Sequence, residues 1–161
     1  MGLAKTYDVI ILGGGLAGLT AALHLSQQGV QILLIEKYEY PHHKVCGEYI
    51  SNEVMPYLRS LGIDPFAKGA VEISKFEISS KEGKKVTTNL PLGGFGISRH
   101  AMDLLLYEKV KEHIDVEFAT AEHVKFQLNK FTIQTTNKEE YQANYVVGAF
   151  GKRSLLDTTL D

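Results

Sequence analysis

The chain has only one cysteine, Cys46, among its 161 residues. A single cysteine cannot form a disulfide within the chain, and this usage is typical of a reducing compartment, so we expect a cytoplasmic protein. No apolar run reaches the roughly 18 to 20 residues of a membrane span. The N-terminal apolar segment is interrupted by glycines and does not resemble a secretory signal. The formal net charge of −2 predicts no broad basic surface for nucleic acid. No Cys/His spacing typical of a metal site is present, and we expect no bound metal.

Glycine, by contrast, is concentrated directly after the first apolar run of the chain. An apolar run, Asp8 to Leu12, leads directly into Gly13, Gly15 and Gly18, which have G-x-G-x-x-G spacing. An alanine- and leucine-rich helix follows, and then a second apolar strand, 32–35, ending in Glu36. A strand, glycine turn, helix, strand and terminal acid within about thirty residues are typical of a dinucleotide-binding unit.

Each part of this unit has a physical role. Gly13 permits the tight turn, Gly15 lets backbone N–H groups approach a pyrophosphate, and Gly18 lets helix and strand pack closely. The helix N-terminus offers partial positive charge and unpaired donors. Glu36 lies 21 residues after Gly15 and can accept hydrogen bonds from ribose hydroxyls. Because a carboxylate repels a 2′-phosphate, the acid favours FAD or NAD. The alternative is a glycine turn in an ordinary α/β unit.

The remaining pattern predicts an α/β fold: a mostly parallel, doubly wound sheet with helices on both faces and a β-meander crossing one side. We expect further helices near 51–61 and 98–112, the second capped by Ser98. We expect strands at 71–79, 84–90, 116–118, 123–128, 131–136, 139–142 and 145–149. The first two alternate apolar and polar residues and are predicted to form a hairpin. Gly93, Gly94 and Gly96 predict a flexible stretch.

The 71–90 hairpin has no evident partner layer in this pattern, so we expect the chain to be the N-terminal part of a longer protein. Residues 71–98 would belong to a partial substrate-domain layer. Unpaired strand edges recruit partners, and we therefore expect self-association. We also expect the isolated chain to bind FAD weakly or to be colourless.

Four segments resemble FAD-dependent oxidoreductases of the p-hydroxybenzoate hydroxylase and geranylgeranyl reductase superfamily. They are GGGLAGLTAA with Glu36, HKVCGEYIS at 43–51, GISRHAMDLLL at 96–106 and YVVGAFGKRS at 145–154. The second is similar to the K-x-C-G-x-x-x-S stretch of the reductase-like branch and is the most specific. The resemblance implies a Rossmann-like FAD/NAD(P)-binding domain, of which residues 1–161 would be the N-terminal part, with the C-terminal remainder of the family fold absent.

The resemblance also implies which residues bind the cofactor. The pyrophosphate would lie on Gly13, Gly14, Gly15, Leu16, Ala17 and Gly18, and the adenosine ribose on Glu36 and Lys37. Lys44, Cys46, Gly47 and Glu48 would lie near the ribityl and flavin end. Arg99 would contact the flavin side, Val124 the adenine, and Gly148, Ala149 and Gly151 would bring the last strand close. For Cys46 the alternative is an ordinary loop thiol, and for Arg99 it is a surface ion pair; an arginine in a first helical turn calls for an anionic partner.

One position departs from the family pattern, because Phe150 stands where the motif has an acid associated with nicotinamide cofactor handling. NAD(P)H remains a candidate electron donor. The resemblance implies a flavin-dependent oxidoreductase, monooxygenase- or reductase-like, acting on an apolar or aromatic small molecule, with no catalytic residue identified. The alternatives are an NAD-binding dehydrogenase and an inactive folded fragment of a flavoprotein.

Overall fold

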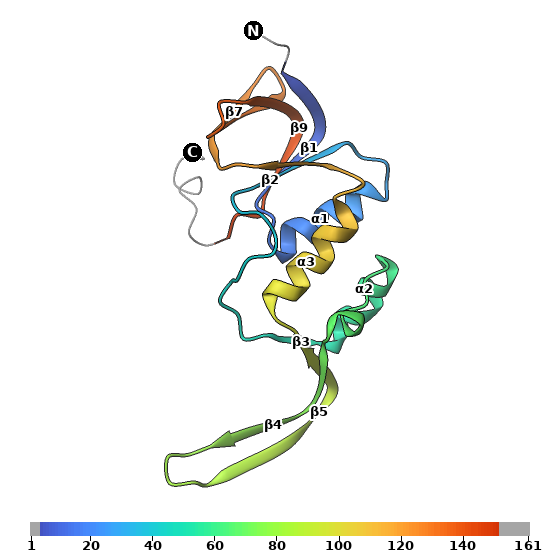
Figure 1. Cartoon of the computed structure of the whole chain (residues 1–161), viewed down its shortest axis with the longest axis vertical. Coiled ribbons are helices and arrows are strands. Elements are labelled where there is room, and N and C mark those ends of the chain that lie inside the picture. The colour runs from blue at the N-terminus through green and yellow to red at the C-terminus, as the bar shows by residue number, and fades with distance from the viewer. Residues whose placement is uncertain (1–3, 152–161) are drawn as a thin grey trace.

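The structure, a computed structural model, describes residues 4–151 and consists of one large sheet, three α-helices and a smaller sheet (Figure 1). The large sheet has the strand order β6-β2-β1-β9-β8-β7. Its strands are β1 (Lys5–Leu12), β2 (Ile32–Glu36), β6 (Asp115–Phe118), β7 (Ala121–Gln127), β8 (Lys130–Thr135) and β9 (Glu140–Gly148). The first four in that order are parallel and the last two are antiparallel, which confirms the predicted mostly parallel sheet with a meander. No helix in the described part of the chain is long and apolar enough to traverse a bilayer.

The opening β1–α1–β2 unit forms as the glycine pattern predicts. Helix α1 (Leu16–Ser26) begins directly after the turn, and Gln27 is its C-cap. Gly29 then adopts a left-handed backbone (φ 75°), as expected of a residue that reverses the chain after a helix. Strand β2 lies parallel to β1, with Val9 opposite Ile32 and Leu12 opposite Ile35. The unit therefore brings the ends of β1 and β2 to one edge of the sheet.

The two faces of the large sheet are covered differently. Val9 and Ile11 share a cluster of buried side chains with Leu19 of α1 and with residues of α2 (Met55–Ser60) and α3 (Arg99–Val110). Ile10 points to the opposite face and clusters with Ile133 of β8. Within residues 4–151 that second cluster contains no helical residue. The prediction of helices on both faces is therefore wrong for the described part, because the curled meander itself covers the second face.

The final strand is longer and more exposed than predicted. The expected separate strands 139–142 and 145–149 form one strand, β9, which pairs with β1 from Tyr141 to Gly148. Ala143 is fully buried, but Tyr145 is 69% exposed, so β9 is not a buried strand throughout. Pairing with both β1 and β8 explains the continuity, since two neighbours supply hydrogen-bond partners along it. Lys152, Arg153 and Ser154 of the YVVGAFGKRS segment lie outside the described residues.

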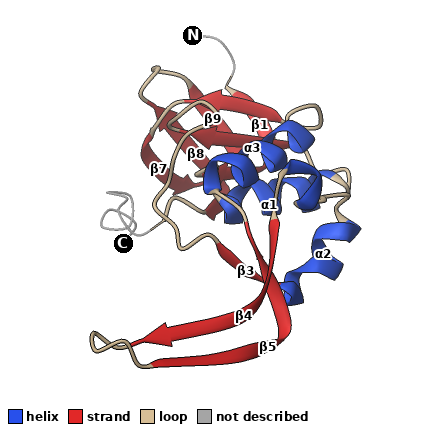
Figure 2. Cartoon of the chain, turned by 60° about the horizontal axis from the view of Figure 1, so that its bottom comes forward, coloured by secondary structure: helices blue, strands red, loops and turns tan. Residues whose placement is uncertain are grey.

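The predicted hairpin is part of a second, three-stranded sheet with the order β3-β5-β4. Its strands are β3 (Tyr49–Ser51), β4 (Val71–Ser79) and β5 (Lys85–Gly96). Strand β3 had not been predicted, and Gly93, Gly94 and Gly96 lie within β5 rather than in a flexible stretch. A side chain at Gly94 would collide with the Tyr49 ring, so the glycine allows β3 to pair closely. The outer part of β4 and β5 extends from the body as an arm (Figure 2).

Two short 3₁₀ helices and α2 connect β3 to β4 within the smaller sheet. Ser51 accepts a hydrogen bond from the Glu53 N–H and begins a 3₁₀ helix, Asn52–Val54, which continues into α2 with Pro56 in its first turn. A second 3₁₀ helix, Phe66–Lys68, precedes β4. Ser98 caps α3 by accepting from the Ala101 N–H, as predicted. The start of α3 is thereby fixed beside the glycine turn.

Candidate functional site

Gly13 and Gly18 hold the ends of β1, α1 and β9 together. Gly13 has φ 104°, and a Cβ there would lie 2.5 Å from the carbonyl oxygen of Ala149. A Cβ at Gly18 would overlap the carbonyl oxygen of Gly13. The Gly13 N–H donates to Ile35, and the Ala149 N–H donates to Leu12. The roles expected of Gly13 in the turn and of Gly18 in close packing are therefore visible as steric requirements.

Gly15 differs from Gly13 and Gly18 because the space beside its Cα, its open side, is bordered by two cationic groups and no backbone atom. A Cβ added there would lie 3.5 Å from Arg99 Nη2 and 3.7 Å from Lys44 Nζ, with nothing else within 4 Å. Gly15 is also the N-cap of α1, which has no side-chain cap and no acidic residue in its first turn. The first N–H groups of the helix thus lack intrahelical partners. Backbone donors, the helix dipole and two cations converge on one small region, an arrangement suited to an anion.

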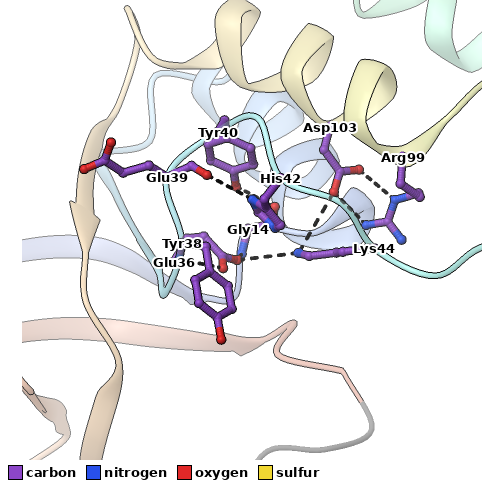
Figure 3. A network of polar contacts seen from close by, with 9 residues as sticks. All are labelled: Gly14, Glu36, Tyr38, Glu39, Tyr40, His42, Lys44, Arg99 and Asp103. Atoms are coloured by element: carbon purple, nitrogen blue, oxygen red, sulfur yellow. Dashed lines mark hydrogen bonds and ion pairs between the residues drawn. The ribbon is translucent and has the colours of Figure 1, made fainter.

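Glu36 lies at the end of β2 beside this turn and is only 5% exposed. Its Oε2 accepts a hydrogen bond from the Gly14 N–H at 2.5 Å, and its Oε1 accepts one from the Tyr38 N–H at 3.2 Å (Figure 3). Lys44 Nζ lies 3.9 Å from Oε2. A carboxylate offers about four lone-pair sites, so two N–H donors leave it able to accept hydroxyl hydrogens as well.

Arg99 has an anionic partner within the chain. Its Nε and Nη2 donate to the two carboxylate oxygens of Asp103 at 2.8 and 2.7 Å, one helical turn further along α3. The Asp103 carboxylate is the main cause that raises the pKa of Arg99. The expected anion beside this arginine is thus supplied by a fully buried aspartate, which the sequence analysis missed although the i, i+4 spacing signals it. Because guanidinium has five N–H donors, Arg99 keeps others free for a ligand.

Lys44 stands between the two carboxylates without bonding closely to either. Its Nζ is 3.9 Å from Glu36 and 4.0 Å from Asp103, and its side chain is 29% exposed. Figure 3 shows Lys44 reaching toward the turn from the loop that follows β2. The four charges Glu36, Lys44, Arg99 and Asp103 sum to zero, so an arriving anion meets no excess of negative charge.

These residues border a cleft of about 1100 Å³, which is large for a small-molecule site. Most of the predicted cofactor residues line it: Gly13, Gly15, Leu16, Ala17, Glu36, Lys37, Lys44, Arg99, Ala149 and Gly151. Seven do not: Gly14, Gly18, Cys46, Gly47, Glu48, Val124 and Gly148. Gly14 belongs to the turn and Gly18 to the first turn of α1, and a Cβ added at Gly148 would lie 3.0 Å from the Phe150 ring. The cleft therefore brings the carboxyl ends of β1 and β2, the residues after β9 and the start of α3 into one site.

Several cleft residues had no signal in the sequence. Residues 119–123 and Thr136 line it because β6 and the meander fold over the end of β2. The Ala119 N–H donates to the Glu36 carbonyl, and Thr120 and Thr136 bond to each other. The structure thus places His123, rather than the adjacent Val124, at the cleft. Phe150, which replaces the family acid, also lines the cleft and gives that wall an apolar ring.

Cys46 is exposed and lies outside the cleft lining. Its Sγ accepts a hydrogen bond from the Glu48 N–H at 3.4 Å, and its proximity to Arg99 contributes to raising the pKa of that arginine. No atom lies within 4 Å of a Cβ added at Gly47, so the end of this loop has room around it. The structure therefore leaves Cys46 and Gly47 beside the charged cluster rather than within it.

Residues 6–161 match the family described as the FAD binding domain. The chain belongs to this family. The glycine turn, the buried acid and the two nearby cations lie within the matched residues.

Individual relatives agree with this membership. The domain is 29% identical over 147 residues to a monomeric sarcosine oxidase from an Arthrobacter species, covering 89% of this chain and 36% of that protein. It is 40% identical over 65 residues to a digeranylgeranylglycerophospholipid reductase from Sulfolobus acidocaldarius, covering 39% of this chain and 14% of that protein. The p-nitrophenol 4-monooxygenase of Pseudomonas putida shares the fold with a TM-score of 0.84 at 18% identity, covering 94% of this chain and 43% of that one. The chain spans less than half the length of the curated relatives that it matches over most of its own length.

Proposed function

We propose that this domain holds the diphosphate of FAD against Gly15, between Lys44 and Arg99, and the adenosine ribose against Glu36. The observation that carries the proposal is the open side of Gly15, where a backbone N-terminus and two cations meet beside a buried carboxylate. The residues fit the group chemically, since N–H donors and cations suit phosphate oxygens and a carboxylate suits sugar hydroxyls.

The charge arrangement supports a ligand that carries about two negative charges. Lys44 and Arg99 are both within reach of Gly15, and each already faces a carboxylate. Lys44 Nζ is too far from both carboxylates for a hydrogen bond, so turning toward a phosphate would cost it little. Arg99 is held in place by Asp103 and need not reorganise. One flexible and one fixed cation would thus close on the diphosphate.

Glu36 favours an unphosphorylated ribose. It is buried, and a 2′-phosphate beside it would place a second negative charge in a region of low dielectric. This supports FAD over NADP but does not separate FAD from NAD. The family membership and the apolar wall at Phe150 support FAD, whose isoalloxazine ring needs a broad apolar surface.

The parent protein would be a flavin-dependent oxidoreductase acting on an apolar or aromatic small molecule, with NAD(P)H as the candidate electron donor. Bound flavin supplies hydride or electron transfer. The residues of this domain bind and orient the cofactor and shield its phosphates from water. The K-x-C-G segment and the local 40% identity to a reductase support the reductase-like type, while the fold shared with a monooxygenase supports the hydroxylase type.

The experiment is a titration of the purified chain with FAD, FMN and NAD⁺, followed by flavin fluorescence and calorimetry. We expect FAD to bind most tightly, and Glu36→Gln to weaken it roughly tenfold, equivalent to about 1.4 kcal/mol. Glu39→Gln, exposed on the loop that follows β2, is the matched control and should leave the dissociation constant unchanged.

Three outcomes separate the alternatives. Tighter binding of NAD⁺ than of FAD would support a dehydrogenase and overturn the FAD assignment. Absence of binding by a folded chain would support an inactive fragment. If Glu36→Gln and Glu39→Gln change the dissociation constant of FAD equally, Glu36 does not bind the ribose.

A further inference from the structure

Gly14, the middle residue of the G-x-G turn, has both of its backbone polar groups bonded to side chains, one from the end of β2 and one from the loop that follows. Its N–H donates to Glu36, and its carbonyl oxygen accepts a hydrogen bond from the Tyr40 hydroxyl (Figure 3). Tyr40 belongs to the loop after β2 and is 26 residues away in the chain. Neither Gly14 nor Tyr40 lines the cleft, so this contact lies beneath the site rather than in it.

The contact orients the peptide that joins Gly14 to Gly15. This peptide is trans, since the described chain has its single cis bond before Pro41. In a planar trans peptide the carbonyl and the following N–H point in opposite directions. Holding the Gly14 carbonyl toward Tyr40 therefore directs the Gly15 N–H away from Tyr40. Two adjacent glycines leave this peptide free to rotate unless an outside group restrains it.

Tyr40 is itself fixed by aromatic packing. Its ring stacks on Tyr107 of α3 with centroids 4.3 Å apart and planes 19° apart, and the Phe118 ring lies 6.2 Å away. Burial and the nearby Glu36 and Asp103 carboxylates raise the pKa of Tyr40, so its hydroxyl keeps the proton that it donates. The same helix carries Arg99 and Asp103 at its start. The orientation of the turn is thus connected to the helix that presents the arginine.

The contact also restricts the residue at position 14. A Cβ added to Gly14 would overlap the Tyr40 hydroxyl and lie 3.0 Å from the Glu36 Cβ. The middle position of G-x-G has no requirement for glycine in the general fingerprint. In this chain, however, any larger residue would displace Tyr40.

We propose that Tyr40 is a positioning residue of the cofactor site: its hydroxyl fixes the Gly14–Gly15 peptide so that the Gly15 N–H is available to the ligand phosphate. The ligand in this statement rests on the proposed function, whereas the fixed peptide is a property of the ligand-free chain. The two can therefore fail separately.

The test compares Tyr40→Phe with Tyr145→Phe. Phenylalanine at 40 keeps the ring and its stacking but removes the hydroxyl, and Tyr145, 69% exposed on β9 and outside the cleft lining, is the control. In ¹⁵N-labelled chain without FAD, we expect Y40F to shift the Gly14 and Gly15 amide resonances and to speed their hydrogen exchange, with Y145F leaving them in place. FAD affinity should fall roughly three- to tenfold in Y40F, the range of one net hydrogen bond.

A double substitution separates positioning from general packing. Gly14→Ala should lower FAD affinity strongly in the wild-type background, and less so in Y40F, because the added methyl then has no hydroxyl to displace. Additive effects would overturn the proposal, as would unchanged glycine amides in Y40F. If the wild-type chain binds no FAD, the proposed function fails, while the amide resonances still decide whether Tyr40 fixes the peptide.

Discussion

Arg99 and Asp103 form a bidentate ion pair one turn apart at the start of α3, with the aspartate fully buried and the arginine side chain 17% exposed. The pair compensates for a cation in the first helical turn, where the dipole disfavours it. It also holds the guanidinium beside Gly15 before any ligand arrives. The ion pair therefore fixes the side chain that we propose contacts the cofactor phosphates.

Breaking this pair should cost stability. Asp103→Asn keeps the shape but removes the charge, leaving a partly buried guanidinium with weaker acceptors, and we expect a loss of about 1–3 kcal/mol in the free energy of unfolding. Glu108→Gln is the control on the same helix: its ion pair with Lys68 is exposed on both sides, and we expect under about 0.5 kcal/mol. Urea unfolding measures both, and equal losses would contradict a special role of Asp103.

Close packing at Gly18 should be intolerant of any side chain. Gly18→Ala would drive a methyl group into the Gly13 carbonyl, so we expect roughly 2 kcal/mol of destabilisation as the helix shifts away from the turn. Gly47→Ala adds the same methyl group where no atom lies within 4 Å. Its free energy of unfolding should stay close to wild type. Similar values for the two variants would show that the turn can relax.

Alkaline pH should destabilise the fold through Tyr141. Burial, with the Glu117 and Glu139 charges, raises the pKa of Tyr141 from 10.0 to about 12. Between these values the unfolded chain loses a proton that the folded chain keeps, so its contribution is complete below pH 10 and disappears as the pH rises toward about 12. Tyr141→Phe should make urea midpoints less steeply dependent on pH above 10. Tyr145→Phe, 69% exposed, should not, and an unchanged slope in both would refute the assignment.

The β4–β5 arm should promote self-association of the isolated chain. Phe76, Ile78 and Val86 share one face of the hairpin and are each more than half exposed, and β4 is an edge strand. We expect a mass above that of the monomer in light scattering at high concentration, reduced by Phe76→Thr with Ile78→Thr. Phe126→Thr, at a similarly exposed edge position on β7, serves as the control. A clean monomer at high concentration would contradict this prediction.

Several elements followed from local patterns alone. The β1–α1–β2 unit, the Ser98 cap and the β4 strand were predictable because short-range spacing of glycine, a capping hydroxyl and alternating residues determines them. Three features could not be predicted in this way. In the described part of the chain, helices cover one face of the large sheet only, β9 is a single continuous strand, and β3 pairs with the glycines of β5. Each depends on which distant strand becomes a neighbour, and no local period records that.

By itself, the sequence determined the glycine turn, the acid at the end of β2 and the membership in a family of FAD-binding domains, since these depend on residue type at fixed spacing. Only the tertiary structure decided that Asp103 orients Arg99, that the Tyr40 hydroxyl bonds to Gly14 and that residues 119–123 line the cleft. These contacts join segments that meet only when the sheet curls and α3 packs on α1. Their geometry depends on long-range packing, which gives a single sequence no short-range signature.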